Sequence, residues 1–173
     1  MTPPMWNDTD LPLAYLITFR SYGTWLHGEA RGSTDRFHHA YKSPHIPRND
    51  RWRDHNRSRL ISEPLVMNLE QRKSVDSAIR EVCEHRHWDL HAISVRTNHA
   101  HVVVSVGVSK PERALNAFKA YATRRLRSSG QWQEPHSPWS DKGSNRYLWN
   151  DRSVGLAIEY VMFGQGDEPP EFE

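Results

Sequence analysis

The chain has 173 residues, of which 36% are hydrophobic, and its mean hydropathy is −0.82, which suits a single domain, residues 1–173, with a polar surface. It contains no run of about 18 apolar residues and no basic segment ahead of its first apolar stretch, so we expect neither a membrane span nor a signal peptide. The single cysteine, Cys83, excludes an internal disulfide, and we expect a cytoplasmic location. The net charge is +2, but residues 31–60 hold eight Arg or Lys against three Asp, and residues 110–130 hold six against one Glu. Such basic segments suggest a polyanion partner on one face, and a solvated surface is an equally good interpretation.

The first predicted element is a strand over residues 13–23, because "LAYLITFRSYG" is rich in β-branched and aromatic residues and stops at glycine. Residues 24–64 follow as a polar, basic segment with scattered Gly and Pro. We expect a long insertion without regular structure there, of the kind that is functional or disordered.

A helix is predicted from Asn68 to about Trp88, since Val75, Ile79 and Val82 recur at three- and four-residue spacing. The stretches 90–97 and 99–106 then read as two strands. Asn98 is a suitable turn residue between them, so we expect an antiparallel hairpin.

Pro111 suits the first turn of a second helix that runs to about Ser128. A short strand is predicted at residues 146–149, and Asn150 or Asp151 can cap a last helix that ends near Phe163. The order of elements predicts an α+β fold, with helices packed on an antiparallel sheet.

The stretch "TNHAHVVVSV" places two histidines in a valine-rich strand. By strand alternation, His99, His101, Val103 and Ser105 share one face, and the other face, with Val102 and Val104, is expected to be the core face. The two imidazoles, roughly 7 Å apart at Cα, can then bind one metal ion, or simply be exposed on a polar face. Histidine-triad hydrolases and two-histidine phosphodiesterases need spacings that this strand lacks.

The last predicted helix carries Tyr160. Its expected buried stripe is Val154, Ala157, Ile158 and Val161, and at about 100° per residue Tyr160 lies roughly 120° from the middle of that stripe. We therefore expect the tyrosine on the flank of the helix, where it serves either packing or chemistry.

Taken together, "NHAH" on a strand, "GSNRYLW" at residues 143–149 and a distal helix ending "EYVMFGQG" resemble the single-tyrosine HUH transposases, and within them the REP-associated tyrosine transposases. The resemblance spans residues 13–166. It implies a ferredoxin-like, RRM-like nuclease fold and an enzyme that cleaves and rejoins single-stranded or hairpin DNA through a 5′-phosphotyrosine intermediate.

Carried onto this sequence, the resemblance implies that Tyr160 is the nucleophile and that His99 and His101 bind Mg²⁺ or Mn²⁺. A Gln or Asn four residues after the tyrosine often completes such a site, but here Gln165 is five residues on. We assign Gln165 as third ligand, which requires the helix to unwind at Gly164 or to contain a π-turn.

Tyr121 is a rival nucleophile, because it flanks the second helix next to a run of arginines. We favour instead a DNA-contacting role for that helix and for the insertion, through charge and stacking. The DNA-contact candidates are Lys119, Tyr121, Arg124, Arg125, Arg127, Trp25, Arg51, Trp52 and Arg53. For the charged side chains, a solvated surface is an equally good interpretation. Four histidines of the insertion match no usual zinc spacing.

Three hypotheses remain open from the sequence. The first is a metal-dependent DNA transposase that is associated with the nucleoid and acts as a monomer or homodimer. The second is a non-catalytic DNA-hairpin-binding protein with the same fold, which the shifted Gln165 would favour. The third is a structural or partner-binding α+β domain, which the two basic segments make less attractive.

Overall fold

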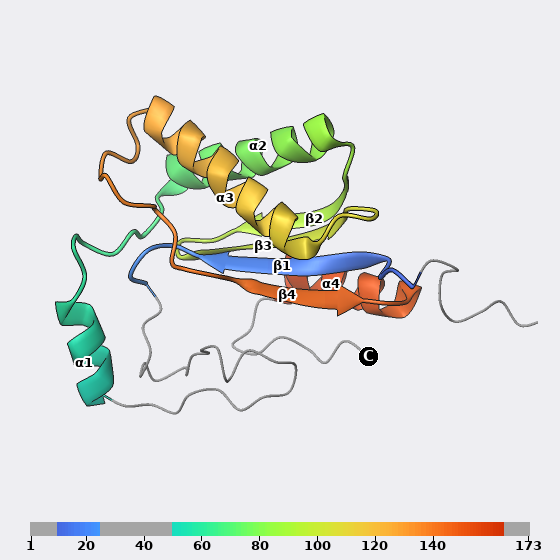
Figure 1. The fold of residues 1–173 in the computed structure, drawn as a ribbon, viewed down its shortest axis with the longest axis horizontal. Helices are drawn as coiled ribbons and strands as arrows, with labels where there is room; N and C mark the ends of the chain where they lie inside the picture. The colour runs from blue at the N-terminus through green and yellow to red at the C-terminus, as the bar shows by residue number, and fades with distance from the viewer. Residues whose placement is uncertain (1–9, 25–49, 165–173) are drawn as a thin grey trace, which may run out of the picture.

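The structure, a computed structural model, describes residues 10–24 and 50–164, apart from the side chains of Trp52, Arg53 and Asn56. Within these ranges the elements are β1 (Ala14–Arg20), α1 (Asp50–Ser58), α2 (Leu69–Arg86), β2 (Asp89–Val95), β3 (His99–Ser105), α3 (Pro111–Ser128), β4 (Ser144–Leu148) and α4 (Asp151–Phe163). Helices α2 and α3 pack side by side on one face of the sheet, and α4 crosses the other face (Figure 1). The predicted α+β class is confirmed.

The sheet has the strand order β2-β3-β1-β4, and every neighbouring pair is antiparallel. β2 and β3 form the predicted hairpin. β3 also pairs with β1, in a register that sets Thr18 opposite His101 and Arg20 opposite His99. The two histidines therefore lie on a central strand, where neighbouring strands fix their direction.

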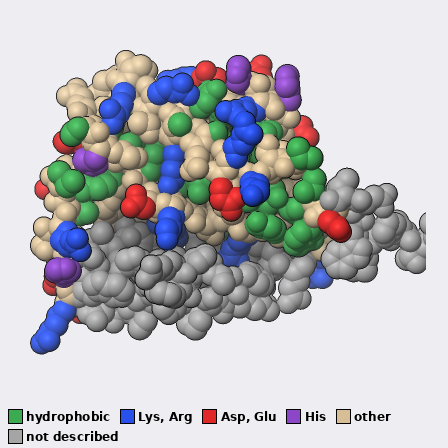
Figure 2. Space-filling view, in the orientation of Figure 1, with side chains coloured by type: hydrophobic (Ala, Val, Ile, Leu, Met, Phe, Trp, Pro, Cys, Tyr) green, Lys and Arg blue, Asp and Glu red, His purple; other side chains and the backbone are tan. Residues whose placement is uncertain are grey.

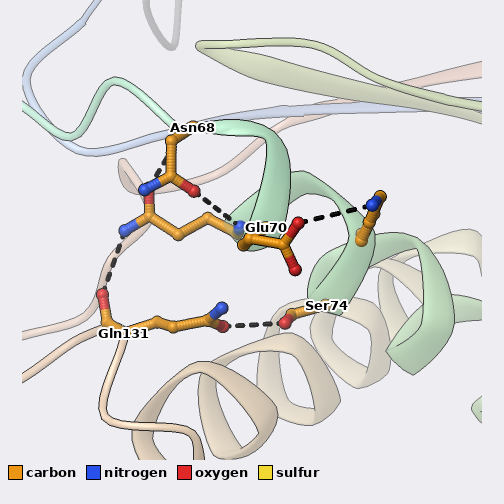
Figure 3. Close-up of polar contacts among 6 residues, drawn as sticks. Asn68, Glu70, Ser74 and Gln131 are labelled. Carbon is orange, nitrogen blue, oxygen red and sulfur yellow. Dashed lines mark hydrogen bonds and ion pairs between the residues drawn. The ribbon is translucent and has the colours of Figure 1, made fainter.

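Helix α2 begins with a reciprocal cap. The side-chain oxygen of Asn68 accepts from the Gln71 backbone N–H, and the Gln71 side chain accepts from the Asn68 N–H, both at 2.9 Å. Figure 3 shows how this first turn is tied to the segment after α3, since the Ser74 hydroxyl donates to the side chain of Gln131 at 2.7 Å. The Gln71 amide also donates to the Gln131 carbonyl at 3.0 Å. The cap thus fixes both the start of α2 and its position beside α3.

The main core lies between the sheet and the α2–α3 layer. Its strand residues alternate as predicted, and the helices contribute the periodic apolar positions. Cys83 is buried in this core, as expected for a helix-face cysteine. The fully buried residues of the main core include Ile17, Phe19, Val75, Ile79, Val82, Ala100, Val102, Val104, Phe118 and Leu126.

The opposite face of β3 is also buried, which corrects the expectation that only the valine face meets a core. Val103 is 0% exposed and His101 is 8% exposed, because α4 folds back over this face. Val103 packs there in a second, smaller cluster with Leu16, Ala157 and Val161. The histidine face is therefore an enclosed face, with apolar packing beside the polar groups.

The segment 24–64 was predicted to lack regular structure, which is wrong for Asp50–Ser58. Asp50 in the first turn and Arg57 in the last turn suit the helix dipole, which helps this short polar helix to form. In Figure 1, α1 stands apart from the sheet and the other helices. None of the helices in residues 10–24 and 50–164 is long and apolar enough to cross a bilayer.

Candidate active site

The two histidines of β3 lie side by side on the face of the sheet that α4 crosses. Their ring centroids are 4.6 Å apart, with the ring planes at 70°. The Nδ1 atom of His101 lies 2.7 Å from the hydroxyl of Thr18, the residue opposite it on β1. The Nδ1 atom of His99 lies 2.7 Å from the side-chain oxygen of Asn98. Each imidazole is therefore oriented by a hydrogen bond to its Nδ1 atom.

Burial sets the protonation state of His101. It lowers the pKa of this imidazole to about 3, with smaller contributions from the positive charges of His99 and of three arginines, Arg20, Arg96 and Arg146. His101 is therefore neutral at physiological pH. A neutral imidazole keeps one nitrogen lone pair, which is what metal ligation requires.

Helix α4 brings Tyr160 to the histidine pair. Asn150 caps the helix, since its side chain accepts from the Ser153 N–H at 2.9 Å. The buried face of α4 is Ser153, Ala157, Tyr160 and Val161, so the predicted flank position of Tyr160 is wrong. Val154 and Ile158 of the predicted stripe are partly buried against the same cluster, and the buried face extends to Tyr160, whose ring meets His101.

The Tyr160 ring is 7% exposed and packs directly on His101 of the same chain. The ring centroids are 5.3 Å apart, with an interplanar angle of 65°. Burial raises the pKa of the Tyr160 phenol, and the guanidiniums of Arg146 and Arg20 oppose that rise. The phenol is therefore protonated at neutral pH, and nearby positive charge favours the phenolate that a nucleophile would have to become.

Arginines around the pair are site residues that the sequence analysis missed. Arg20 lies opposite His99 in the β1–β3 ladder, and Arg146 lies opposite Leu16 in the β1–β4 ladder. Both therefore project from the same face of the sheet as the histidines. Arg96 joins them from the turn, where its backbone N–H donates to the His99 carbonyl at 2.8 Å. Strand alternation alone could have predicted one of these arginines, because Arg20 lies two residues after Thr18 and so on the same face of β1.

The candidate DNA contacts on α3 lie on the other side of the sheet. Tyr121 packs against the main core, and the Arg124 guanidinium stacks 4.5 Å from the centre of its ring. Because the sheet separates Tyr121 from the histidines, it does not compete with Tyr160 for this site. Figure 2 shows Lys and Arg interspersed with Asp and Glu on the surface that α2 and α3 form.

Three further basic side chains of α3 have partners within the chain. Arg125 donates to the Ser77 hydroxyl at 3.1 Å and pairs with Glu81 on α2. Arg127 donates to two backbone carbonyls of residues 135 and 136 at 3.2 Å. Lys119 donates to the carbonyl of Ser140 at 2.9 Å and to that of Lys142. Much of the basic run on α3 therefore makes stabilising contacts within the chain.

The remaining predicted site residues are only partly described. Arg51 is exposed on α1. The side chains of Trp52 and Arg53 lie outside the described part of the structure. Trp25 and Gln165, the predicted third ligand, also lie outside it.

The histidine pair fits part of the shell of a divalent cation. The described residues contain no group of three or more His, Cys, Asp or Glu that could hold a metal on its own. Two imidazoles supply two ligands, and Mg²⁺ prefers oxygen donors for the rest of its octahedral shell. Water and phosphate oxygens would have to supply those positions, which suits a site that is completed by its substrate.

Two comparisons relate this chain to transposases, one by sequence and one by fold. Residues 58–152 match the family model described as "Transposase IS200 like", which is more than half of the chain and includes both histidines. A crystal structure of a candidate transposase from Deinococcus radiodurans R1 has a TM-score of 0.50 and 11% identity, covering 93% of this chain and 95% of that chain. At this identity the similarity concerns the fold. No curated protein matches significantly.

Proposed function

The chain belongs to the family of IS200-like transposases, and from this premise we propose that it cleaves and rejoins single-stranded DNA with Tyr160 as its nucleophile. The observation that carries the proposal is the packing of the Tyr160 ring on His101, at 5.3 Å between centroids within one chain. A buried tyrosine beside a histidine pair and three arginines has the parts that phosphodiester transesterification needs. The family match ends at residue 152, so the tyrosine is assigned from geometry and resemblance.

The arginines and the histidines have different tasks in this proposal. The guanidiniums of Arg20 and Arg146 bind the non-bridging oxygens of the scissile phosphate and favour the phenolate form of Tyr160. His99 and His101 would hold Mg²⁺ or Mn²⁺, with Gln165 as a proposed third ligand. When bound, the ion neutralises charge that develops on the phosphate.

Cleavage is a balanced exchange of two phosphate ester bonds. The Tyr160 oxygen forms a bond to phosphorus, the bond from phosphorus to the 3′ oxygen breaks, and the phenol proton ends on the released 3′-hydroxyl. The DNA is then held as a 5′-phosphotyrosine ester. Attack by a 3′-hydroxyl on that ester restores Tyr160 and joins the strands, so no nucleotide triphosphate is needed.

The proposed substrate is single-stranded or hairpin DNA, as in the REP-associated branch that the sequence resembles. Cationic side chains on α1, including Arg51 and Arg57, offer phosphate contacts away from the sheet. Because Tyr160 meets His101 within one chain, each copy carries its own tyrosine and histidine pair. A homodimer would then be two complete sites.

An adduct assay tests the proposal. The protein is incubated with Mn²⁺ and 3′-labelled single-stranded and hairpin oligonucleotides, because a 5′-phosphotyrosine ester keeps the 3′ part of the strand on the protein. Adducts that resist SDS are then counted on gels. We expect an adduct for the wild type and for Tyr121→Phe, and none for Tyr160→Phe, which keeps the ring that packs on His101. Adduct formation by Tyr160→Phe would refute the assignment, and DNA binding without any adduct would favour the non-catalytic hairpin-binding alternative.

A further inference from the structure

The turn between β2 and β3 contains a side chain that acts on His99. The Asn98 side-chain oxygen lies 2.7 Å from the Nδ1 atom of His99, in a half-buried position. An amide oxygen can only accept a hydrogen bond, so the shared proton must belong to the imidazole. This places the proton on Nδ1 and the lone pair on Nε2.

Asn98 is itself held in place through its backbone carbonyl. Its backbone carbonyl accepts from the Ser21 N–H at 2.9 Å and lies 3.2 Å from the Ser21 hydroxyl. Ser21 is fully buried at the end of β1, and its hydroxyl donates to the Leu65 carbonyl at 2.6 Å. The turn is thus fixed to β1 and to the segment that leads into α2.

His101 has a partner of a different kind. Thr18 is 2.7 Å from its Nδ1 atom, but a hydroxyl can donate or accept, so it is compatible with either tautomer of the imidazole. Of these two contacts, the one with Asn98 dictates which imidazole nitrogen carries the proton, and the one with Thr18 does not. The asymmetry makes Asn98 the residue whose loss should change the ligand chemistry of the pair.

We propose that Asn98 is a positioning residue that fixes His99 as the Nδ1–H tautomer, so that Nε2 is the atom offered to the metal ion. The inference rests on the proposed function for its consequence, but the tautomer itself does not depend on metal. Partners of this kind, which orient a metal-binding histidine, typically contribute about 10- to 100-fold in metal affinity. Asn98→Ala should therefore weaken Mn²⁺ binding about tenfold or more.

The test combines two readouts on the full chain. Long-range ¹H–¹⁵N correlation spectra of the metal-free protein report the tautomer of His99, which is assigned with the variant His99→Gln. Mn²⁺ affinity is measured by electron paramagnetic resonance without DNA. The variants are Asn98→Ala, Asn98→Asp, whose carboxylate still accepts from Nδ1, and the control Asn116→Ala, which is exposed on α3 beyond the sheet.

We expect the Nδ1–H tautomer in the wild type, in Asn98→Asp and in the control, and a mixture of tautomers in Asn98→Ala. We also expect Asn98→Asp to bind Mn²⁺ at least as tightly as the wild type. An Nε2–H tautomer in the wild type, or an unchanged tautomer in Asn98→Ala, would overturn the inference, as would unchanged Mn²⁺ affinity in a variant whose tautomer is released. A wild type with the expected tautomer that binds no Mn²⁺ would overturn the metal-binding part of both proposals, while the spectra would still decide the tautomer.

Discussion

The packing of Gly143 against β1 gives a prediction whose size follows from the structure. A Cβ atom at residue 143 would lie 2.7 Å from the Thr18 carbonyl oxygen and 3.0 Å from both methyl carbons of Leu115. Carbon atoms pack best at about 3.5–4.0 Å, so the backbone of β1 would have to move. Overpacking of this kind typically costs about 1–3 kcal/mol. Thr18 also contacts His101, so the displacement would reach the site.

A second glycine provides the matched control. A Cβ atom at Gly155, exposed in the middle of α4, would meet nothing within 4 Å. Replacing a helical glycine by alanine at such a position stabilises by up to about 1 kcal/mol, because alanine loses less backbone entropy on folding. The same chemical change is therefore expected to have opposite signs at the two positions.

Thermal unfolding followed by circular dichroism measures both effects. For a chain of this size, 1 kcal/mol shifts the midpoint by roughly 2–4 °C, so we expect Gly143→Ala to lower it by about 2–12 °C and Gly155→Ala to raise it by up to about 4 °C. A Gly143→Ala protein that is as stable as the wild type would refute the close approach of residue 143 to Thr18. Shifts of the same sign in both variants would refute the contrast between them.

Two further predictions concern the charges of the site. Because the pKa of His101 is about 3 when folded and 6.5 when unfolded, the unfolded chain binds the extra proton between these values, and stability is lost as the pH falls below 6.5. In urea titrations with EDTA, the free energy of unfolding should fall by about 2 kcal/mol by pH 5 because of this group. His101→Gln should lack that part of the slope, and an identical slope would contradict the buried neutral imidazole. Arg146→Ala should slow adduct formation about 10- to 100-fold, as expected for the loss of a charged hydrogen bond to phosphate. Arg113→Ala, exposed on α3, should not, and equal rates for the two variants would remove Arg146 from the site.

Local sequence patterns predicted most of the elements because the information is local. Periodicity placed α2, α3 and α4, and the alternation of β3 put both histidines on one face. The error about that face came from tertiary packing, since Val103 was an apolar residue on the supposed polar side. Its presence was a signal that another element covers the face. Which helix covers that face depends on the direction of the chain after β4, and the alternation of residues within a strand cannot reveal this direction.

The site residues that the sequence did not predict also depend on tertiary packing. Tyr160 was identified by resemblance, but its buried position follows from how α4 rotates to cover the sheet. Arg146 was missed because its closeness to the histidines depends on β4 pairing with β1, far apart in the sequence. The DNA-contacting role of the basic run on α3 stays a prediction, and counting charges could not show that Arg125 also pairs with Glu81 on α2.

The assignment of Tyr160 as nucleophile is tested most directly by identifying the residue that carries DNA. A wild-type adduct formed with Mn²⁺ is digested with trypsin and nuclease, and the modified peptide is sequenced by mass spectrometry. The two candidates fall in different peptides, residues 153–173 for Tyr160 and residues 120–124 for Tyr121. We expect a nucleotide phosphate on Tyr160 alone. A phosphate on Tyr121, or on any other residue, would contradict the account.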